Sequence, residues 1–431
     1  MLRNLLVLML VIMLSLWCAA AFAEGNSERS FSTWSVSILK DLFKVTEDNL
    51  SLLNTGVLSP DGKTVVWGNG RDLLCFYDLD EDRVVCYPTP EQLAIPHYFV
   101  WSPDSQTIAF SEDLFRYLNE SDIWMVNAAT GSFTDCTDDG VIGGFPTAKD
   151  PYWLDYLPNW DPITTDLLFF RSEKQEAECS LELRSLNPDL CTSGQLVVSE
   201  RSKQIVDLTG QLAGSFPIHR QPAISPDGSR MAVIVTSDLR DDPQNGIWMI
   251  DLIEESICQI ATLEAFAVGF PSWHDTSSVL PEQISWTAEG EGLVVFLHDV
   301  AGFGIAPDRT VVYLDADTSE IHPLISWKGF DTGPDFYRAG EDGHTGVFRM
   351  ARQAILMSDR KTLITVHHEY SSGLLTFIAQ TLPPDASEPS VIGEVPFDER
   401  ASGHGPGLVL ASQSNVVLLF NRYLVSFNYG G

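Results

Sequence analysis

The stretch LSPDGKTVVW, residues 58–67, joins a tight turn to a run of β-branched and aromatic residues. In the turn, Ser59 can bond the local backbone, Pro60 fixes its own φ, and Gly62 tolerates a left-handed conformation. The residues from Thr64 to Trp67 favour an extended strand. The stretch therefore predicts two antiparallel strands joined by a turn at residues 59–62.

The same phrase recurs along the chain. WSPDSQTIAF at residues 101–110 and ISPDGSRMAVIV at residues 224–235 are clear copies, and divergent copies begin near residues 159, 285, 357 and 411. A second strand pair follows each clear copy, so the repeating unit has four antiparallel strands. Such units repeated around an axis form a β-propeller. The copies predict an all-β fold with seven blades; six blades is the alternative, because the third and sixth copies are divergent.

The last copy leaves room for only three strands before Gly431. A propeller commonly closes when its N-terminal segment supplies the missing outer strand. Trp34–Val45 is predicted to take that role, with a short helix over residues 38–45 as the alternative. We therefore assign residues 24–54 to an N-terminal segment that closes the ring and residues 55–431 to the propeller.

The Ser-Pro-Asp phrases, together with the strands DIWMV at residues 122–126 and GIWMI at residues 246–250, resemble the WD40-like repeats of TolB-type β-propellers. The resemblance is specific in three copies and weak in four, and it extends from about residue 55 to the end. TolB has an additional α/β domain for which this chain has no room, so its envelope partnership is not expected here. Some prolyl peptidases join similar propellers to a hydrolase domain, but the chain contains no G-x-S-x-G motif.

Residues 1–23 have the pattern of a secretory signal peptide. Arg3 precedes an unbroken apolar run from Leu5 to Leu16, and Ala21-Phe22-Ala23 forms a small-x-small cleavage site. The run is short for a membrane span, and no second candidate follows. We expect an exported mature chain, periplasmic or extracellular, without a transmembrane segment.

The chain is strongly acidic, with a formal net charge of −33 at pH 7. Such a charge repels phosphate backbones, so nucleic acid is not an expected partner. A protein or peptide partner is expected instead. A closed ring leaves few strand edges for self-association, and we expect a monomer.

Six cysteines follow the predicted cleavage site, an even number that suits an oxidising compartment. Cys75 and Cys86 lie symmetrically about a predicted hairpin turn and are expected to form a cross-strand disulfide. Cys179 and Cys191 bracket a polar insertion that a disulfide could close. Cys136 and Cys258 fall on outer strands of different blades and are expected to be unpaired.

Histidines gather in the connections between blades. The inner strand comes first in each propeller blade, so these connections lie on one face of the ring, here called the top face, and the Ser-Pro-Asp turns lie on the bottom face. Imidazoles around a central channel could hold a divalent metal or an acidic ligand. Oligogalacturonate lyases are similar in binding a metal through channel histidines. The candidate ligand-binding residues are His97, His219, Arg220, His274, His344, Arg349 and His404, of which His219, His274 and His344 are the candidate metal ligands. The alternative is that long loops simply collect polar residues.

Two functions fit these patterns. The chain shows no nucleophile, cofactor motif or complete metal motif, which favours a non-catalytic binding scaffold that acts outside the cytoplasm through its top-face loops. The alternative is a metal-dependent lyase or hydrolase that acts on an acidic glycan at the propeller axis. The sequence favours a protein that is not an enzyme, and it indicates no catalytic residue. It predicts no cofactor other than a possible divalent metal at the axis. Fold alone decides neither function.

Overall fold

The structure is a computed structural model. It describes residues 34–42, 56–69, 72–91, 93, 96–112, 121–138, 152–175, 178–191, 202–212, 218, 220–237, 242–269, 279–299, 309–324, 349–369, 373–384, 389–396 and 407–429. The predicted signal peptide, residues 1–23, lies outside these ranges.

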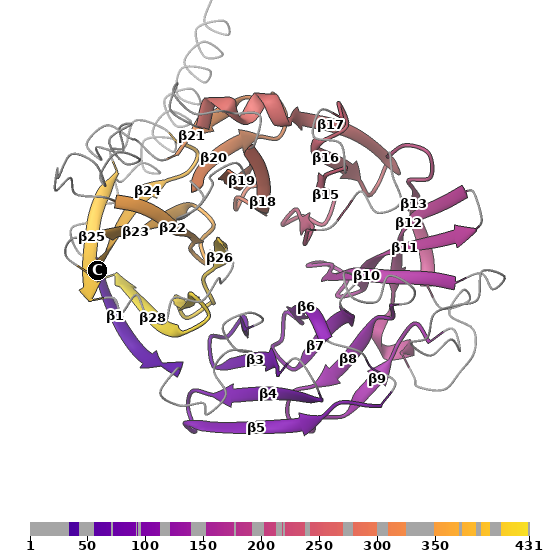
Figure 1. Cartoon of the computed structure of the whole chain (residues 1–431), viewed down its shortest axis with the longest axis horizontal. Coiled ribbons are helices and arrows are strands. Elements are labelled where there is room, and N and C mark those ends of the chain that lie inside the picture. The colour runs from indigo at the N-terminus through magenta and orange to yellow at the C-terminus, as the bar shows by residue number, and fades with distance from the viewer. Residues whose placement is uncertain are drawn as a thin grey trace, which may run out of the picture.

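The described strands form seven sheets arranged as blades around a central axis (Figure 1). The prediction of a seven-bladed all-β propeller is confirmed, and the six-bladed alternative is wrong. Sheets in blades 1 to 5 have four antiparallel strands each, in sequence order from the axis outward.

The strand bounds are as follows. Blade 1 contains β2 (Val57–Leu58), β3 (Thr64–Gly68), β4 (Leu73–Asp78) and β5 (Arg83–Pro88); blade 2 contains β6 (Pro96–Trp101), β7 (Thr107–Glu112), β8 (Trp124–Asn127) and β9 (Phe133–Asp135). Blade 3 contains β10 (Tyr152–Trp160), β11 (Leu167–Gln175), β12 (Glu178–Leu186) and β13 (Ser202–Asp207), with the short helix η3 (Pro188–Leu190) between the last two. Blade 4 contains β14 (Ala223–Ile224), β15 (Arg230–Val235), β16 (Gly246–Asp251) and β17 (Ser256–Thr262), and η4 (Leu263–Gly269) follows it. Blade 5 contains β18 (Val279–Trp286), β19 (Gly292–Asp299), β20 (Arg309–Asp315) and β21 (Ile321–Pro323). Blade 6 contains β22 (Arg349–Leu356), β23 (Thr362–Glu369), β24 (Leu374–Thr381) and β25 (Ser390–Pro396); blade 7 contains β26 (Leu408–Leu410), β27 (Val416–Leu419), β28 (Tyr423–Tyr429) and β1 (Trp34–Asp41).

The ring closes where the two ends of the fold meet. Strand β1 pairs antiparallel with β28, from Trp34 opposite Tyr429 to Asp41 opposite Tyr423. The residues up to Asp41 are therefore a strand rather than a helix. The guanidinium of Arg422 donates to Asp41 at 2.8 and 2.9 Å, and Leu42 is fully buried with Trp67 and Leu424.

Blade 7 departs from the predicted four-stranded sheet. Its innermost strand, β26, pairs in parallel with β22 of blade 6, so that one sheet has five strands and the next has three. Backbone bonds from Ala354 N to Gly407 O and from Ala411 N to Leu356 O hold β26 there. The inner strand thus bridges the last two blades.

The Ser-Pro-Asp turns are built from their own side chains. In blade 4, Ser225 Oγ donates to Asp227 Oδ1 at 2.6 Å and accepts from the Arg230 backbone N–H at 2.9 Å. The same two bonds occur at Ser59 and Ser102. Hydrogen bonds from Ser225 and Ser229 lower the pKa of Asp227 to about 2. The phrase is therefore architectural, as its spacing predicts.

Turns of neighbouring blades also contact one another, which places them on one face of the ring. The Gln413 backbone N–H donates to Pro60 O at 2.7 Å, and the Asp61 N–H donates to Ser105 Oγ at 3.1 Å. Between blades 4 and 5, Arg230 donates to Gly290 O at 2.6 Å, and between blades 6 and 7, Ser358 Oγ donates to Asn415 Oδ1 at 2.7 Å. These turns make up the bottom face.

Tryptophans at the ends of inner strands join adjacent blades. Trp101, Trp160 and Trp286 each donate an indole N–H to an inner-strand carbonyl of the preceding blade, at 2.8 to 3.3 Å. The apolar core lies between the blades, as in the cluster where Ile234 of β15 packs with Trp286 and Val295 of blade 5. Each blade therefore buries its faces against its neighbours.

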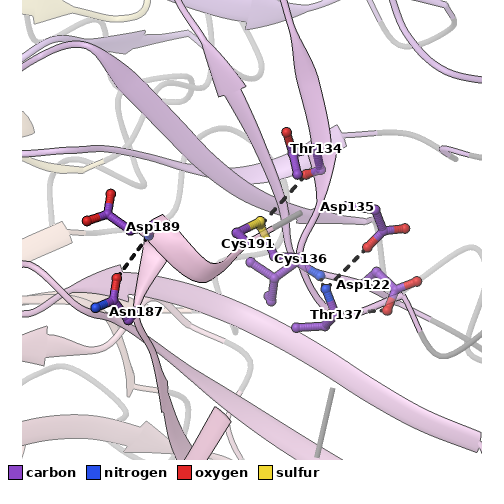
Figure 2. The surroundings of a disulfide bond; sticks show 9 residues. Asp122, Thr134, Asp135, Cys136, Thr137, Asn187, Asp189 and Cys191 are labelled. Carbon is purple, nitrogen blue, oxygen red and sulfur yellow. Dashed lines mark hydrogen bonds between the residues drawn. A yellow bond between two sulfur atoms is a disulfide. The ribbon is translucent and has the colours of Figure 1, made fainter. Parts of the chain in front are cut away.

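The described residues contain two disulfides, and one of them corrects the predicted pairing. Cys75 and Cys86 are bonded across β4 and β5, as expected. Cys191, however, is bonded to Cys136 and not to Cys179 (Figure 2). Cys136 was also expected to be unpaired, because Cys136 and Cys258 fall on outer strands of blades that are not neighbours. Cys136 directly follows β9, the outer strand of blade 2. That position lies against blade 3, where Cys136 packs with Leu186 at the end of β12, so η3 brings Cys191 to it. Cys258 is free and exposed.

No helix within the described ranges is long and apolar enough to cross a membrane.

Candidate functional site

The structure places only some of the predicted top-face residues. His97 lies within β6, rather than ahead of it, and its half-buried ring packs edge-on against Tyr98 with the centroids 4.3 Å apart. Arg220 is exposed in the connection that leads to β14. Arg349 begins β22, where its backbone is opposite Glu369. His219, His274, His344 and His404 lie outside the described residues.

The predicted metal site is therefore not tested. His219, His274 and His344 all fall outside the described ranges, and within those ranges no group of three or more His, Cys, Asp or Glu side chains could hold a metal ion. The buried ring of His367 on β23 lies 2.9 Å from the hydroxyl of Thr365, a contact within the blade. The convergence of the three histidines stays a prediction.

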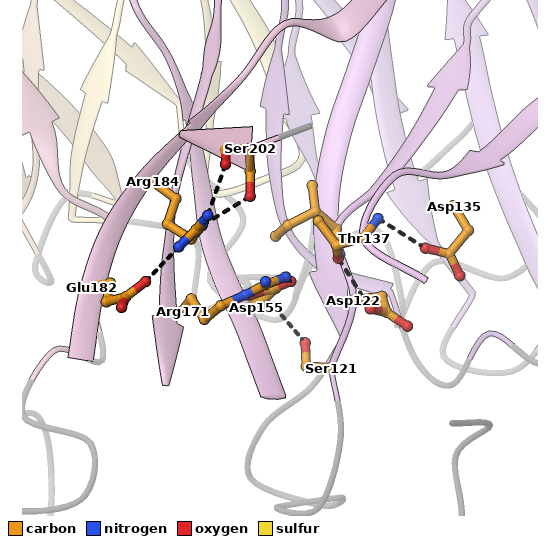
Figure 3. Close-up of polar contacts among 10 residues, drawn as sticks. Ser121, Asp122, Asp135, Thr137, Asp155, Arg171, Glu182, Arg184 and Ser202 are labelled. Atoms are coloured by element: carbon orange, nitrogen blue, oxygen red, sulfur yellow. Dashed lines mark hydrogen bonds and ion pairs between the residues drawn. The ribbon is translucent and has the colours of Figure 1, made fainter. Parts of the chain in front are cut away.

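A buried polar network joins blades 2 and 3 (Figure 3). Asp155 of β10 and Arg171 of β11 are opposite each other, with Nε and Oδ1 2.7 Å apart and both side chains at most 5% exposed. Burial alone lowers the pKa of Arg171, but the Asp155 carboxylate outweighs this and raises it. Trp153 lies beside the guanidinium, 4.8 Å from its carbon to the ring centroid. The cation is thus enclosed by an anion and an aromatic face.

Blade 2 contributes the other half of this network. Ser121 donates its hydroxyl to Asp155 O at 2.9 Å and accepts the Asp155 N–H at its own carbonyl at 2.8 Å. Next to this contact, within blade 2, the Thr137 hydroxyl donates to Asp122 Oδ1 at 3.0 Å. The bonds between Ser121 and Asp155 and the Cys136–Cys191 disulfide therefore join blade 2 to blade 3.

A cavity of about 310 Å³ lies inside the ring of inner strands. We call it the axial cavity, because β6, β10, β14, β18 and β26 all contribute to its wall. Several of its polar side chains join neighbouring blades: Asn159 donates to Pro222 O at 2.8 Å, Gln221 donates to Pro158 O at 2.5 Å, and Gln283 accepts from the Leu408 N–H. The wall is therefore held by bonds between blades.

In the part of the chain that the structure describes, one charged residue lines the axial cavity: Arg360, in the turn between β22 and β23. Sequence reasoning missed it, because MSDRK reads only as a divergent bottom-face turn. The turn is fixed by the Arg360 N–H bond to Met357 O at 2.8 Å and by the Ala288 N–H bond to Arg360 O at 3.2 Å. Only closure of the ring brings this position to the axis.

A second pocket of about 350 Å³ lies near the bottom turns of blades 5 and 6. Glu291, Asp315 and Asp317 contribute carboxylates, and Tyr313 contributes an aromatic wall. Hydrogen bonding from the Thr318 backbone lowers the pKa of Asp315. The pocket is acidic, as is the chain as a whole.

No family model matches this chain, and a search of curated proteins finds no match. Solved structures share the propeller architecture. Hydrazine synthase of Kuenenia stuttgartiensis is 11% identical with a TM-score of 0.48, over 88% of this chain and 96% of that one. A putative TolB from Agrobacterium tumefaciens is 17% identical with a TM-score of 0.40, over 68% and 88%. A chain of the mitotic checkpoint complex is 11% identical with a TM-score of 0.46, over 93% of each chain. The likeness concerns the fold alone.

Proposed function

We propose that this protein is an exported, non-catalytic binding scaffold that recognises a protein or peptide through its top-face loops, as a distant relative of TolB-type propellers. One observation carries the proposal: the two faces have connections of very different length. Most turns on the bottom face are short, such as residues 79–82 between β4 and β5, and the longest connection there runs from residue 187 to residue 201 between β12 and β13. Connections between blades are long, such as residues 136–151 before β10 and 324–348 before β22.

This asymmetry suits recognition, because binding residues are concentrated in loops held by a rigid scaffold. In the described part of the scaffold, the Cys136–Cys191 disulfide and the two hydrogen bonds between Ser121 and Asp155 hold blade 2 against blade 3. The disulfides also suit an oxidising compartment, which supports export. A domain boundary after residue 23 and a monomeric state remain part of the proposal.

Charge reversal on the two faces tests this function. Arg220→Glu changes an exposed residue of a top-face connection, and Arg83→Glu makes the same change of charge at an exposed bottom turn. A partner captured by the unchanged protein from extracytoplasmic extract, and then purified, is expected to bind Arg220→Glu at least about tenfold more weakly, because a buried interfacial charge of the wrong sign is costly. Its affinity for Arg83→Glu should match that for the unchanged protein. Equal losses in both variants would contradict recognition by the top face.

Metal analysis tests the alternative of a metal-dependent lyase or hydrolase. This alternative is supported only by the sequence positions of His219, His274 and His344. If it is right, the purified mature chain holds close to one equivalent of a divalent metal, and His219→Ala and His344→Ala each release it. The binding scaffold predicts a metal content that neither substitution changes, with His322→Ala, an exposed bottom-face histidine, as the control.

A further inference from the structure

The axial cavity holds a positive charge without a counter-charge. Arg360 is partly buried and lines the cavity, and within the described part of the chain its guanidinium has no hydrogen bond or ion pair. Burial lowers the pKa of Arg360, and no carboxylate offsets that effect. Arginine nevertheless keeps its proton in proteins. A cation partly removed from water is costly unless an anion pairs with it.

The charged groups next to Arg360 in sequence are already engaged. Asp359 accepts from the backbone N–H groups of Lys361 and Thr362, both at 2.9 Å. Lys361 forms an ion pair with Glu289 of the neighbouring turn. The nearest carboxylates therefore serve the turn and the lysine, and Arg360 remains available.

The backbone of Arg360 adopts a conformation that is uncommon for residues other than glycine. Its φ is +50°, in the left-handed region that glycine adopts most easily. The corresponding turn residues of the other six blades share a positive φ and are uncharged: Gly62, Ser105, Thr165, Gly228, Gly290 and Asn415. Strained positions of this kind often mark functional sites. Among these bottom-turn positions, Arg360 alone carries a charge.

Two neutral hydrogen-bond donors accompany the cation. The side-chain oxygen of Gln283 accepts from the Leu408 N–H, which leaves the amide nitrogen for another partner. That nitrogen and the Ser285 hydroxyl belong to the cavity wall and have no partner among the described residues. Among the described residues, the wall contains no acidic side chain, although the chain carries a net charge of −33.

The remaining wall is apolar. Leu410, on β26, is 50% exposed although it lies inside the ring, and Leu408 and Ile224 also line the cavity. A volume of about 310 Å³ is at the small end of the range for ligand sites. A ligand that fits must therefore be small and must combine an anionic group with an apolar body.

We propose that the axial cavity binds a small organic carboxylate, whose carboxylate group pairs with Arg360 and whose apolar part contacts Leu408 and Leu410. The planar guanidinium matches a carboxylate through two parallel hydrogen bonds. The Gln283 amide and the Ser285 hydroxyl supply further donors. This site is separate from the top-face surface of the proposed function, and neither depends on the other.

Calorimetric titration of the full mature chain with acetate, butyrate, hexanoate and benzoate tests the proposal. Saturable binding is expected for the larger acids, with an affinity that rises from acetate to hexanoate as more apolar surface is buried. Benzamide, which has a similar shape but no charge, is expected to bind at least about tenfold more weakly than benzoate. If none of the four acids binds, the proposal is wrong.

Two variants assign the binding to this cavity. Arg360→Gln is expected to weaken benzoate binding at least about tenfold and to leave benzamide binding unchanged, because only the charge pairing is lost. Arg83→Gln removes an equal charge at an exposed turn and is expected to bind benzoate as the unchanged protein does. Leu410→Asp places a carboxylate on the exposed cavity wall and is expected to abolish binding even if Arg360→Gln does not fold. Benzoate binding of equal strength in the unchanged protein and in either cavity variant would overturn the proposal.

Discussion

An Asp155→Ala variant is expected to lose about 3–5 kcal/mol of unfolding free energy, because it leaves the buried Arg171 guanidinium without its anion. The Arg171 side chain is only 5% exposed, so water cannot replace the carboxylate. Chemical denaturation followed by tryptophan fluorescence measures the loss.

The same blade provides a matched control. Glu182 and Arg184 form an ion pair of the same type, but their side chains are 24% and 11% exposed, and Arg184 also donates to Ser202 Oγ at 2.8 Å. Glu182→Ala is therefore expected to cost at most about 1 kcal/mol. The double variant Asp155→Leu/Arg171→Met, which removes both charges, should recover much of the loss. If Asp155→Ala lowers the unfolding free energy no more than Glu182→Ala does, burial of the ion pair does not determine its contribution to stability.

Deletion of residues 34–42 is expected to lower the unfolding free energy by more than about 5 kcal/mol. The deletion removes strand β1, exposes the cluster that contains Leu42, and leaves Arg422 without Asp41. It also leaves β28 as an open edge, which promotes aggregation. Thermal unfolding and light scattering of the deletion variant measure both effects.

A peptide that spans residues 33–43 provides the control. Added in excess to the deletion variant, it should restore the transition temperature toward that of the complete chain, because binding of the native state raises its stability. The same peptide with Asp41→Ala and Leu42→Asp should not. A deletion variant that is as stable as the complete chain would contradict closure by β1.

Most of the fold could be predicted from the sequence, because its turns are specified locally. The bonds from Ser225 to Asp227 and to the Arg230 N–H depend on residues at most five positions apart. A turn of this kind is visible wherever the phrase is kept, and the phrases together reveal the number of blades. The parallel pairing of β26 with β22 was not predictable, since it depends on how the last two blades meet.

The disulfide pairing could not be predicted from the local sequence, because it depends on how neighbouring blades pack. Cys179 and Cys191 are near in sequence, yet Cys191 reaches Cys136 of the preceding blade, 55 residues away. The sequence tells which strands are outer, but not which part of a blade faces its neighbour. Arg360 was missed for a similar reason: its turn is ordinary by composition, and only the closed ring places it at the axial cavity.

We propose that the protein recognises a protein or peptide partner through the top face. Incorporation of a photo-crosslinking residue at position 220 or at position 163 tests it most directly. Arg220 is exposed in a top-face connection, and Ile163, 63% exposed, lies in the bottom turn between β10 and β11. Irradiation in extracytoplasmic extract is expected to give a specific adduct from position 220 and none from position 163. An adduct from position 163 alone would contradict recognition by the top face.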